Sequence, residues 1–503
     1  MGEINRLRVK SPYELMKIVD IKIENKPNEH GYLYLKCLID DTINFQSTIK
    51  ASTEDEICVY EELEDIDNEN KSTSSNENTI NINEVNERNS KRLFNGIVQN
   101  IRTTNINEIY YLEIQALTSS FKLDIKEKSR SFQNVDMTYD ALINEILKNY
   151  SGYTFTQNIG KGQKTGKPLF QYKETDWNFL KRIASELKSE LYCDIINLNY
   201  MFNFGIPSEH SYKLNDNMNY EAFKNLKRFH EAGGDEVYHD TDYFYYEIKI
   251  RNILEIGSEI YFKQKELYVR EYEAYRNKEE IIYKYKLCRK NGVWQTKLYN
   301  SLLSGASIEG KVLAVKEELV KLHLNIDENQ SEEEAFWFRY APPSVNIMYA
   351  MPSIGESVRL YFPSEGNEEP IITGCVRKNG DTCGQTSDTT SRYFQTEHGS
   401  EIAILPGALN IKGGSKEPLS INFEDESGVT LTSPTGLNLN AGGEIVIRTR
   451  NSINISAQSQ ILMTKGNTEN GVSIEGEFHI RANNVIKNGS SRESYAPFAE
   501  GGV

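Results

Sequence analysis

The chain has 503 residues, which at about 150 residues per domain predicts three or four domains. Its 57 Lys and Arg residues against 73 Asp and Glu residues give a formal net charge of −16, which argues against a protein that coats nucleic acid. Hydrophobic residues make up 38% of the chain and aromatic residues 11%, enough for folded cores, which argues against wholesale disorder.

Targeting signals are missing from the sequence. Residues 1–6 contain no apolar signal-peptide core, and Arg6 stands where a myristoylation signal after Gly2 needs Ser or Thr. No apolar run approaches the ~18 residues of a membrane-spanning helix. We therefore expect neither secretion through a signal peptide nor a membrane anchor.

The cysteines are scattered along the chain, and none of them forms a CxxC pair. A disulfide scaffold or a zinc ribbon needs clustered cysteines. We therefore expect reduced and mostly buried thiols, with Cys375 and Cys383 as the weak exception because they are close in sequence. The six cysteines are Cys37, Cys58, Cys193, Cys288, Cys375 and Cys383.

The N-terminal region is predicted to be rich in strands, because residues 31–39 and 110–117 mix Tyr with aliphatic residues. An acidic segment interrupts this region. From Glu54 to Glu87 the chain has twelve acidic residues and one basic residue, a net charge of −11. Because such a composition cannot bury a core, we predict a flexible insertion over residues 54–90. It is either a tolerated surface insertion or an electrostatic docking segment.

Two amphipathic helices are predicted next. Thr138 is a candidate N-cap for the first helix, which ends before Gly152, and Thr175 is a candidate N-cap for the second. We interpret both apolar stripes as faces that pack in the core. The stripes are Leu142, Ile143, Ile146, Leu147 and Tyr150 in the first helix, and Trp177, Leu180, Ile183, Ala184, Leu187 and Leu191 in the second.

A different pattern begins at Ser307, where strand-like runs follow one another without an intervening helix. Gly310 and Gly374 lie inside two of the runs, where they indicate bulges or tight bends. Five such strands predict a small closed barrel of OB type within residues 301–385. The runs are 308–316, 319–326, 335–341, 356–362 and 370–376.

The most specific pattern is an eight-residue repeat near the C-terminus. Six apolar pairs, each spaced i, i+2, start eight residues apart: Ile421/Phe423, Val429/Leu431, Leu437/Leu439, Ile445/Ile447, Ile453/Ile455 and Ile461/Met463. Two apolar residues that flank an often polar one are typical of a strand with one covered face. After the sixth pair the phase slips by three residues, and the pattern resumes at Val472/Ile474 and Phe478/Ile480.

An eight-residue period supplies one strand and one corner, which together make one face of a three-sided prism. One chain would complete only two coils from six repeats, whereas three chains would stack six layers per face, roughly 28 Å tall at ~4.7 Å per layer. We therefore predict an intertwined homotrimeric β-helix over residues 386–490, with the twelve paired residues, Val472 and Ile474 in the trimer core. A single-chain β-helix and a meandering sheet are the alternatives.

Several strings resemble those of VgrG-type spike proteins and occur in the family's order. Residues 94–98 resemble its F-x-G-I-V strand, and residues 171–180 resemble its QY-E-D-FL helix start. Residues 356–362 and 369–374 resemble the barrel segments G-Q-E-V-x-V-x-F and R-P-I-I-x-G. Residues 396–402 resemble the T-x-x-G-N-E-I string that begins the spike.

The resemblance implies the central spike of a contractile injection system, such as a phage tail, a tailocin, an extracellular injection particle or a type VI secretion system. It implies a mainly β fold in which residues 1–300 form a hub with two barrel-like domains and helices, followed by the OB-like barrel and the trimeric spike shaft. Expected partners are further copies of the chain, tail tube and baseplate proteins, a separate PAAR-like tip protein and the target cell envelope. The resemblance also allows effector cargo. It implies assembly in the bacterial cytoplasm and allows release of the particle from the cell.

The sequence predicts no catalytic residue, no cofactor, no metal and no nucleic-acid partner. Residues 160–168 match a phosphate-binding loop only superficially, and residues 230–234 lack the second His of an HExxH motif. Some spike tips hold iron through a His-x-His pair, but the shaft region has only His398 and His479. We interpret residues 491–503 as a seat for the tip protein.

Two other functions stay open at this point. A cell-wall hydrolase folded into the hub would make the spike an enzyme. A trimeric adhesin or receptor-binding fibre would also end in a stiff β-shaft, but it would call for a secretion or anchoring signal. The barrel that directly precedes the shaft favours the spike.

Overall fold

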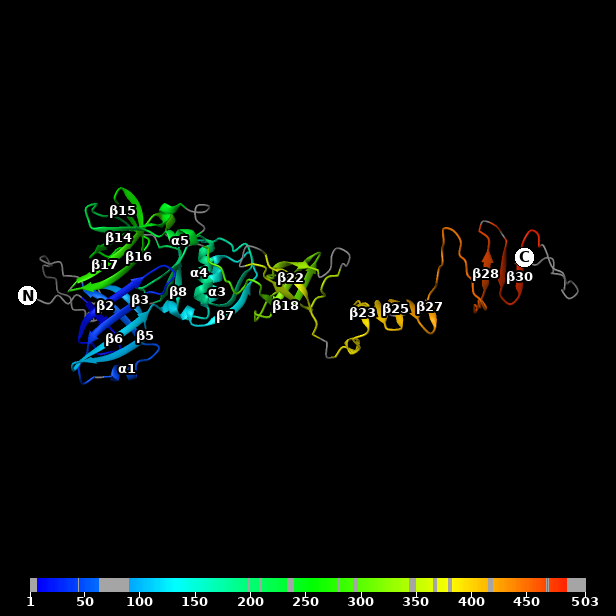
Figure 1. Cartoon of the computed structure of the whole chain (residues 1–503), viewed down its shortest axis with the longest axis horizontal. Coiled ribbons are helices and arrows are strands. Elements are labelled where there is room, and N and C mark those ends of the chain that lie inside the picture. Colours follow the sequence, from blue (N-terminus) through cyan, green and yellow to red (C-terminus); the bar gives the residue numbers. More distant parts are fainter. Residues whose placement is uncertain are drawn as a thin grey trace, which may run out of the picture. The chain divides into compact units, whose positions relative to one another are not determined.

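The computed structural model describes residues 7–43, 45–62, 90–197, 199–207, 210–232, 239–278, 280–292, 297–342, 350–364, 369–378, 382–414, 419–466, 468 and 470–485. The chain divides into two compact units, Met1–Gly380 and Asp381–Val503. Most of the regular structure is β (Figure 1), so the predicted mainly β fold class is confirmed. Among the described residues, none of the helices has the length and apolarity of a membrane span.

The hub strands fall into two groups that share one twelve-stranded sheet. The groups meet where β2 pairs with β16, with Asn25 opposite Tyr272 (Figure 1, blue strands beside green). The first group is β1 (Leu7–Lys10), β2 (Lys17–Asn25), β3 (Tyr32–Leu38), β4 (Glu56–Glu62), β5 (Ser90–Ile106) and β6 (Ile109–Leu117). The second is β12 (Ser211–Lys213), β13 (Tyr220–Lys224), β14 (Phe244–Ile250), β15 (Glu259–Phe262), β16 (Lys265–Asn277) and β17 (Glu280–Cys288).

Alternation of side chains explains why the hub sheet has one covered face. In β3, Leu33, Leu35 and Cys37 are buried while their neighbours are partly exposed, as the period of two in a strand requires. β6 repeats the pattern, and it pairs with β3 along the length of that strand. The strands predicted at residues 31–39 and 110–117 are therefore confirmed as β3 and β6.

The structure corrects the N-terminal limit of the acidic insertion. Residues 56–62 form β4 and pair with β5, and Ile57 and Val59 are wholly buried. The count of charges gives no sign of this strand. Its acidic residues lie at its two ends, outside the buried positions. Residues 63–89 lie outside the described residues.

Both predicted helices are present with their predicted caps. The Ala141 N–H donates to the Thr138 hydroxyl before α3 (Tyr139–Leu147), and the Asn178 N–H donates to the Thr175 hydroxyl before α4 (Asp176–Glu186). Their apolar faces are buried, so the core-packing interpretation is confirmed. The second stripe was predicted to reach Leu191, but that residue begins a strand because the chain has left α4 at Glu186.

The remaining elements of the first unit connect these parts. They are α1 (Gln46–Lys50), η1 (Ser119–Asp124), β7 (Glu127–Phe132), β8 (Thr154–Gln157), β9 (Leu169–Thr175), β10 (Leu191–Cys193), β11 (Tyr200–Phe204), α5 (Leu226–Glu231), η3 (Asp240–Tyr243) and η4 (Lys290–Gly292). β7 pairs with β9, and β8, β10 and β11 form a small sheet.

A buried carboxylate anchors the start of α4. Asp176 has no exposed side-chain surface, and its Oδ1 accepts hydrogen bonds from Arg130 at 2.6 Å and from Gln171 at 2.9 Å. Its Oδ2 accepts from Lys128 at 2.6 Å and from Tyr150 at 2.8 Å. Both cations come from β7, so this cluster fastens the helix to the two-stranded β7–β9 sheet.

A second buried ion pair links distant segments of the hub. The Arg270 guanidinium on β16 lies 3.1 Å from the Glu190 carboxylate, which directly precedes β10, and both side chains are at most 1% exposed. Arg270 also donates to the carbonyl oxygen of Gly292 at 3.1 Å. Since buried charges are retained only when they are paired and hydrogen-bonded, this pair fixes the packing of β16 on β10.

The barrel predicted after Ser307 is confirmed as a closed five-stranded barrel of order β18-β19-β20-β22-β21. Its strands are β18 (Ser307–Lys316), β19 (Leu319–Leu324), β20 (Trp337–Ala341), β21 (Ser357–Tyr361) and β22 (Ile371–Val376). Gly374 has φ +61° and lies at a register shift between β21 and β22, so the predicted bulge is present. Gly310 lies where β18 pairs with β19 on one side and β21 on the other. A Cβ at this position would lie only 2.8 Å from the carbonyl oxygen of His323.

The second unit contains two antiparallel sheets. We call the five-stranded one sheet F: β23 (Arg392–Gln395), β24 (Glu401–Leu405), β25 (Ala408–Gly413), β26 (Leu419–Glu424) and β27 (Gly428–Thr432), each strand paired with the next (Figure 1). The three-stranded one is sheet G: β28 (Ile461–Thr464), β29 (Gly471–Ile474) and β30 (Phe478–Arg481). Residues 433–460, all of them described, contain no strand.

The six cysteines are free thiols, as predicted. Four of them are buried, Cys375 is exposed and Cys383 is partly exposed. Burial raises the pKa of Cys37 and of Cys288 to about 12. Because the thiolate is the reactive form, buried thiols of this kind are inert.

Replacing Asp176 by Asn should destabilise the hub strongly. The change leaves Lys128 and Arg130 facing a neutral amide, and breaking a buried pair in this way costs about 3–5 kcal/mol. Calorimetry of the full chain should show a markedly lower hub transition temperature. Asp136→Asn is the control, because Asp136 pairs with Lys164 at the exposed surface. Equal shifts in both variants would show that the buried cluster does not hold α4.

Native protein treated with a thiol reagent at pH 8 should react quickly at about two sites per chain, and at all six cysteines after denaturation. The two fast sites should be lost in the variant Cys375→Ser/Cys383→Ser. Absorbance of the released chromophore counts the thiols. A third fast site in that variant would mean that one of the four buried cysteines opens to solvent.

Candidate functional site

The predicted trimer-core residues occupy three successive stretches of the second unit. The first two pairs lie in β26 and β27, the next three lie in residues 433–460, and the last lie in β28 and β29. In chain order they are Ile421, Phe423, Val429, Leu431, Leu437, Leu439, Ile445, Ile447, Ile453, Ile455, Ile461, Met463, Val472 and Ile474.

Where these residues form strands, each i, i+2 pair lies on one face of its sheet. Ile421 is opposite Leu431, and Phe423 is opposite Val429, across β26 and β27. In sheet G the same holds for the last predicted pairs, with Ile461 opposite Ile474 and Met463 opposite Val472. The strands of each sheet are consecutive in one chain, as in the meander that was the alternative arrangement.

These apolar side chains remain in contact with solvent in the single chain. Twelve of the fourteen are between 36% (Ile421) and 67% (Ile455) exposed, and Ile461 and Val472 are partly buried. The six residues of the central three pairs are all at least 52% exposed. A soluble protein rarely leaves so large a contiguous apolar set uncovered, and such a set marks an interaction surface. Trimerisation itself stays a prediction here, because the structure describes one chain.

Sequence periodicity missed part of this apolar surface. Phe394, Ile402, Ile404 and Ile411 are at least 38% exposed, and Leu409 is partly exposed. The i, i+2 signal is present at 402/404 and 409/411. It was overlooked because these pairs start seven and then twelve residues apart, which breaks the period of eight.

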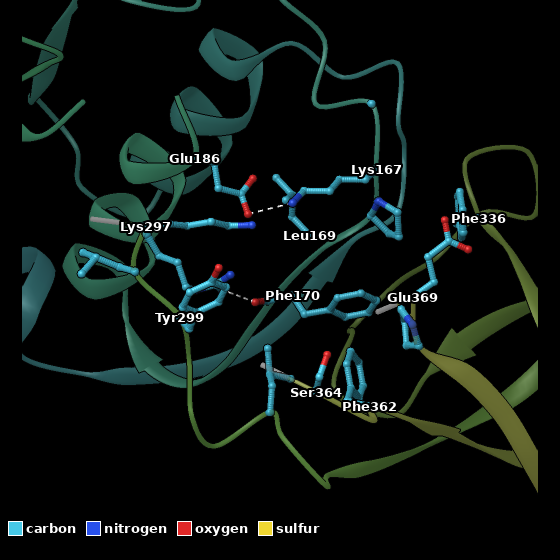
Figure 2. Close-up of a pocket in the computed structure, with 16 residues that line it drawn as sticks. Lys167, Leu169, Phe170, Glu186, Lys297, Tyr299, Phe336, Phe362, Ser364 and Glu369 are labelled. Atoms are coloured by element: carbon cyan, nitrogen blue, oxygen red, sulfur yellow. Dashed lines mark hydrogen bonds and ion pairs between the residues drawn. The ribbon is translucent and has the colours of Figure 1, made fainter. Parts of the chain in front are cut away.

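One aromatic side chain of the hub packs into the core of the barrel. Phe170 belongs to β9 of the hub but packs within the barrel core, 4.8 Å from the ring of Phe362 in edge-to-face geometry (Figure 2). Polar contacts also join the barrel to the hub. Asp327 accepts hydrogen bonds from the N–H of Ser131 at 2.5 Å and from its hydroxyl at 2.6 Å. Burial raises the pKa of the Asp327 carboxyl.

A cavity of about 240 Å³ lies beside Phe170, between the hub and the barrel. Phe170, Phe336 and Phe362 line its apolar side, while the Lys167 ammonium pairs with Glu186 at 2.8 Å on the hub side (Figure 2). Because its charged groups include both signs and several are already paired, the cavity resembles an imperfectly filled domain junction more than a ligand pocket.

A serine, histidine and carboxylate also come together, but they cannot act as a catalytic triad. His30 Nδ1 lies 2.9 Å from the Ser120 hydroxyl, and His30 Nε2 lies 3.4 Å from the Asp124 carboxylate. Ser120 is wholly buried and contacts the Cys193 thiol at 3.0 Å, so substrate has no access to the hydroxyl. His30 packs on the ring of Trp177, and burial lowers its pKa.

The motifs set aside on sequence grounds form no site in the structure. In the part of the chain that is described, His, Cys, Asp and Glu residues form no group of three or more suited to a metal ion. Residues 160–168 form turns between β8 and β9, with Gly160 and Gly166 at positive φ.

Phe170→Ala should uncouple the barrel from the hub. Removing a buried Phe leaves a cavity and typically costs about 3–5 kcal/mol. Differential scanning calorimetry should show the barrel unfolding at a lower temperature, separately from the hub. Phe45→Ala is the matched control, since Phe45 is 53% exposed. If the two variants melt alike, Phe170 does not hold the junction.

Comparison with known proteins identifies the hub. Residues 58–187 match the family described as Phage tail baseplate hub (GPD). That segment runs from β4 to the end of α4 and contains both capped helices and the Asp176 cluster. Among curated proteins, no sequence matches this chain.

Solved structures extend the likeness beyond the hub. The E. coli c3393 protein, described as a type VI secretion component similar to T4 bacteriophage tail proteins gp27 and gp5, is 12% identical with a TM-score of 0.50. The match covers 74% of this chain and 100% of that one. A chain of the half-lidded Francisella PdpA–VgrG complex is 10% identical with a TM-score of 0.52, covering 85% of this chain and 87% of that one. The lidded form of that complex gives 10% identity, a TM-score of 0.51, and coverage of 85% and 79%.

Together, these findings confirm the resemblance drawn from the sequence strings. Residues 58–187 are similar to the phage tail baseplate hub family, and the chain shares the fold of the VgrG-type hub-and-spike structures.

Proposed function

We propose that three copies of this chain form the central spike of a contractile injection system, which plugs the tube and baseplate and pierces the target envelope when the sheath contracts. The observation that carries the proposal is the set of evenly spaced, exposed apolar pairs in a chain that also contains a baseplate hub domain. A rigid spike needs both a hub to receive force and a stiff shaft to deliver it.

Trimerisation follows from the amount of apolar surface in the repeats. Each apolar side chain contributes ~1.5–3 kcal/mol when it is fully buried, so covering twelve of them supplies a large driving force. One chain does not realise this gain in full, since eleven of the twelve paired residues are at least 36% exposed in it. Three chains around one axis can bring the pairs together and leave the polar residues between them in water.

Rigidity is the mechanical consequence of this arrangement. Ladder hydrogen bonds in stacked strands run along the stack, and three sheets closed around an axis leave few free edges for slippage. Within the first unit, buried charge clusters tie the hub segments together, and the barrel is fixed to the hub by Phe170 and Asp327. The spike therefore acts by holding its shape, with no catalytic turnover.

The proposed partners follow from this role. The hub contacts tail tube and baseplate proteins, and a separate PAAR-like tip protein and effector cargo attach to the shaft. The particle is assembled in the bacterial cytoplasm and meets the envelope of the target cell. The adhesin alternative does not account for the match of residues 58–187 to the baseplate hub family.

The double variant Ile445→Asp/Ile453→Asp should abolish the trimer. In three chains it would place six carboxylates on the axis, where desolvation and mutual repulsion outweigh the gain from the remaining apolar residues. Gel electrophoresis without boiling should show loss of SDS-resistant trimers, and electron microscopy should show loss of particle assembly.

Asn438→Asp/Asn454→Asp is the matched control, because it adds the same number of charges at the intervening polar positions. Trimers should persist in that variant. Intact trimers in the Ile445→Asp/Ile453→Asp variant would show that the eight-residue repeat does not define the axis.

A further inference from the structure

A groove of about 600 Å³ lies on the hub, where residues from five segments meet. The segments are the loop before β4, the strand β5, the helix η1, the start of β7 and the residues that follow α3. Three lysines line the groove, Lys122, Lys126 and Lys128, together with one carboxylate, Glu54. We call it the lysine groove. Its volume lies within the ~300–1,000 Å³ of pockets that hold small ligands, so a short peptide segment fits.

Two of the lysines are held in place by aromatic rings. The Lys122 ammonium lies 5.3 Å from the centre of the Tyr153 ring, and the Lys128 ammonium lies 5.2 Å from the centre of the Tyr150 ring. Cation–π contacts of this kind position a lysine without neutralising its charge. Because less side-chain freedom is then lost on binding, both ammonium groups are prepared to meet a charged partner.

The charge of the lysine groove is opposite to that of the chain as a whole. Glu54 lies 3.4 Å from Lys122, but its side chain is 75% exposed, so this pair is weak. Asp176 pairs with Lys128 and shares its charge with Arg130. With the exposed Lys126, four cations face two carboxylates, in a chain with a net charge of −16. A positive groove on an acidic protein attracts a negatively charged segment.

An apolar surface accompanies the lysines. Ile125 lies between Lys122 and Lys126 in the sequence, lines the same groove and is 68% exposed. Phe121 and the buried Val98 line the groove as well. A partner that brings only charge would leave Ile125 in water, whereas an aliphatic side chain would cover it and add apolar contact. The lysine groove therefore suits a segment that carries both carboxylates and an aliphatic residue.

We propose that the lysine groove binds an acidic segment of another protein of the injection particle, with carboxylates on Lys122 and Lys126 and an aliphatic side chain on Ile125. The proposal rests on the proposed function for the kind of assembly in which the partner occurs, but it does not require the trimer. A nucleic acid suits the groove less well, because its phosphates bring charge on every nucleotide and no aliphatic side chain.

Titration of the full-length protein with an acidic peptide tests the proposal. The probe is a fluorescent, amidated peptide Glu-Glu-Leu-Glu-Asp-Ile-Asp-Asn-Glu, which has the sequence of residues 61–69 and combines carboxylates with Leu and Ile. Fluorescence anisotropy should show saturable binding that weakens as salt is added, because exposed charges are screened. The same peptide with Gln and Asn in place of its acidic residues should not bind.

The variant Lys122→Gln/Lys126→Gln should weaken binding of the peptide about tenfold, which corresponds to about 1.4 kcal/mol. Lys128 is left in place because it pairs with the buried Asp176. Lys161→Gln/Lys227→Gln is the matched control, since both lysines are exposed and neither lines the groove. Equal affinities in the two variants would overturn the proposal.

Ile125→Ser tests the apolar contact without touching a lysine. It should weaken binding about threefold, whereas Ile49→Ser, at an isoleucine that is 71% exposed and outside the groove, should leave the affinity unchanged. Both replaced side chains are exposed, so the hub should unfold at the same temperature in both variants. Equal affinities would show that no aliphatic side chain covers Ile125, and would also overturn the proposal.

Two competing occupants give distinct results. Equal competition by a nine-nucleotide oligothymidylate would show that the groove recognises charge alone. Peptide binding that appears only in the variant Glu64→Gln/Asp65→Asn/Asp67→Asn/Glu69→Gln would show that this chain fills its own groove. Either result would overturn an acidic partner protein. Light scattering of the same samples measures the native mass, so the trimer of the proposed function and the peptide site can fail independently.

Discussion

The exposed apolar side chains of the second unit are the feature on which the proposed structure of this protein depends. In β26 and β27 the apolar residues alternate with polar ones, and in the strandless segment 433–460 large aliphatic side chains such as Ile447 and Ile455 are about two-thirds exposed in one chain. Water-exposed apolar surface of this extent has to be covered, and the gain from covering it grows with area. Under the proposed function, association of identical chains would cover it, because every copy brings the same apolar residues.

The first unit is organised by buried charge clusters. Two buried carboxylates, Asp176 and Glu190, each tie segments far apart in sequence through arginine or lysine partners. Such clusters add little net stability compared with apolar packing, but losing one partner is costly, so the packing they specify is hard to change. Phe170 extends this connection into the barrel core.

Much of this organisation could be predicted from local patterns in the sequence. Thr138 and Thr175 were identified as helix caps because capping uses residues within one turn, and the five barrel strands were identified by their length and spacing. The faces of β26 and β27 followed from a period of two. In each case the information lies within a few consecutive residues.

Other features could not be predicted because they depend on contacts between distant residues. Nothing near Asn25 indicates that β2 pairs with β16, and nothing near Phe170 indicates a place in the core of another domain. Glu190 and Asp176 are ordinary acidic residues in the sequence, and only the fold surrounds them with cations. The apolar pairs of β24 and β25, at residues 402/404 and 409/411, do not follow the period of eight because the turns that connect the strands differ in length.

The central proposal is that the exposed apolar residues of the second unit lie on the axis of three identical chains. Electron cryomicroscopy of the purified full-length protein tests it most directly, since a map shows both the number of chains and the side chains at the axis. The account predicts a threefold shaft with Ile402, Ile421 and Ile445 pointing to its centre. A shaft formed by one chain folded on itself, or a threefold shaft with these residues facing solvent, would contradict it.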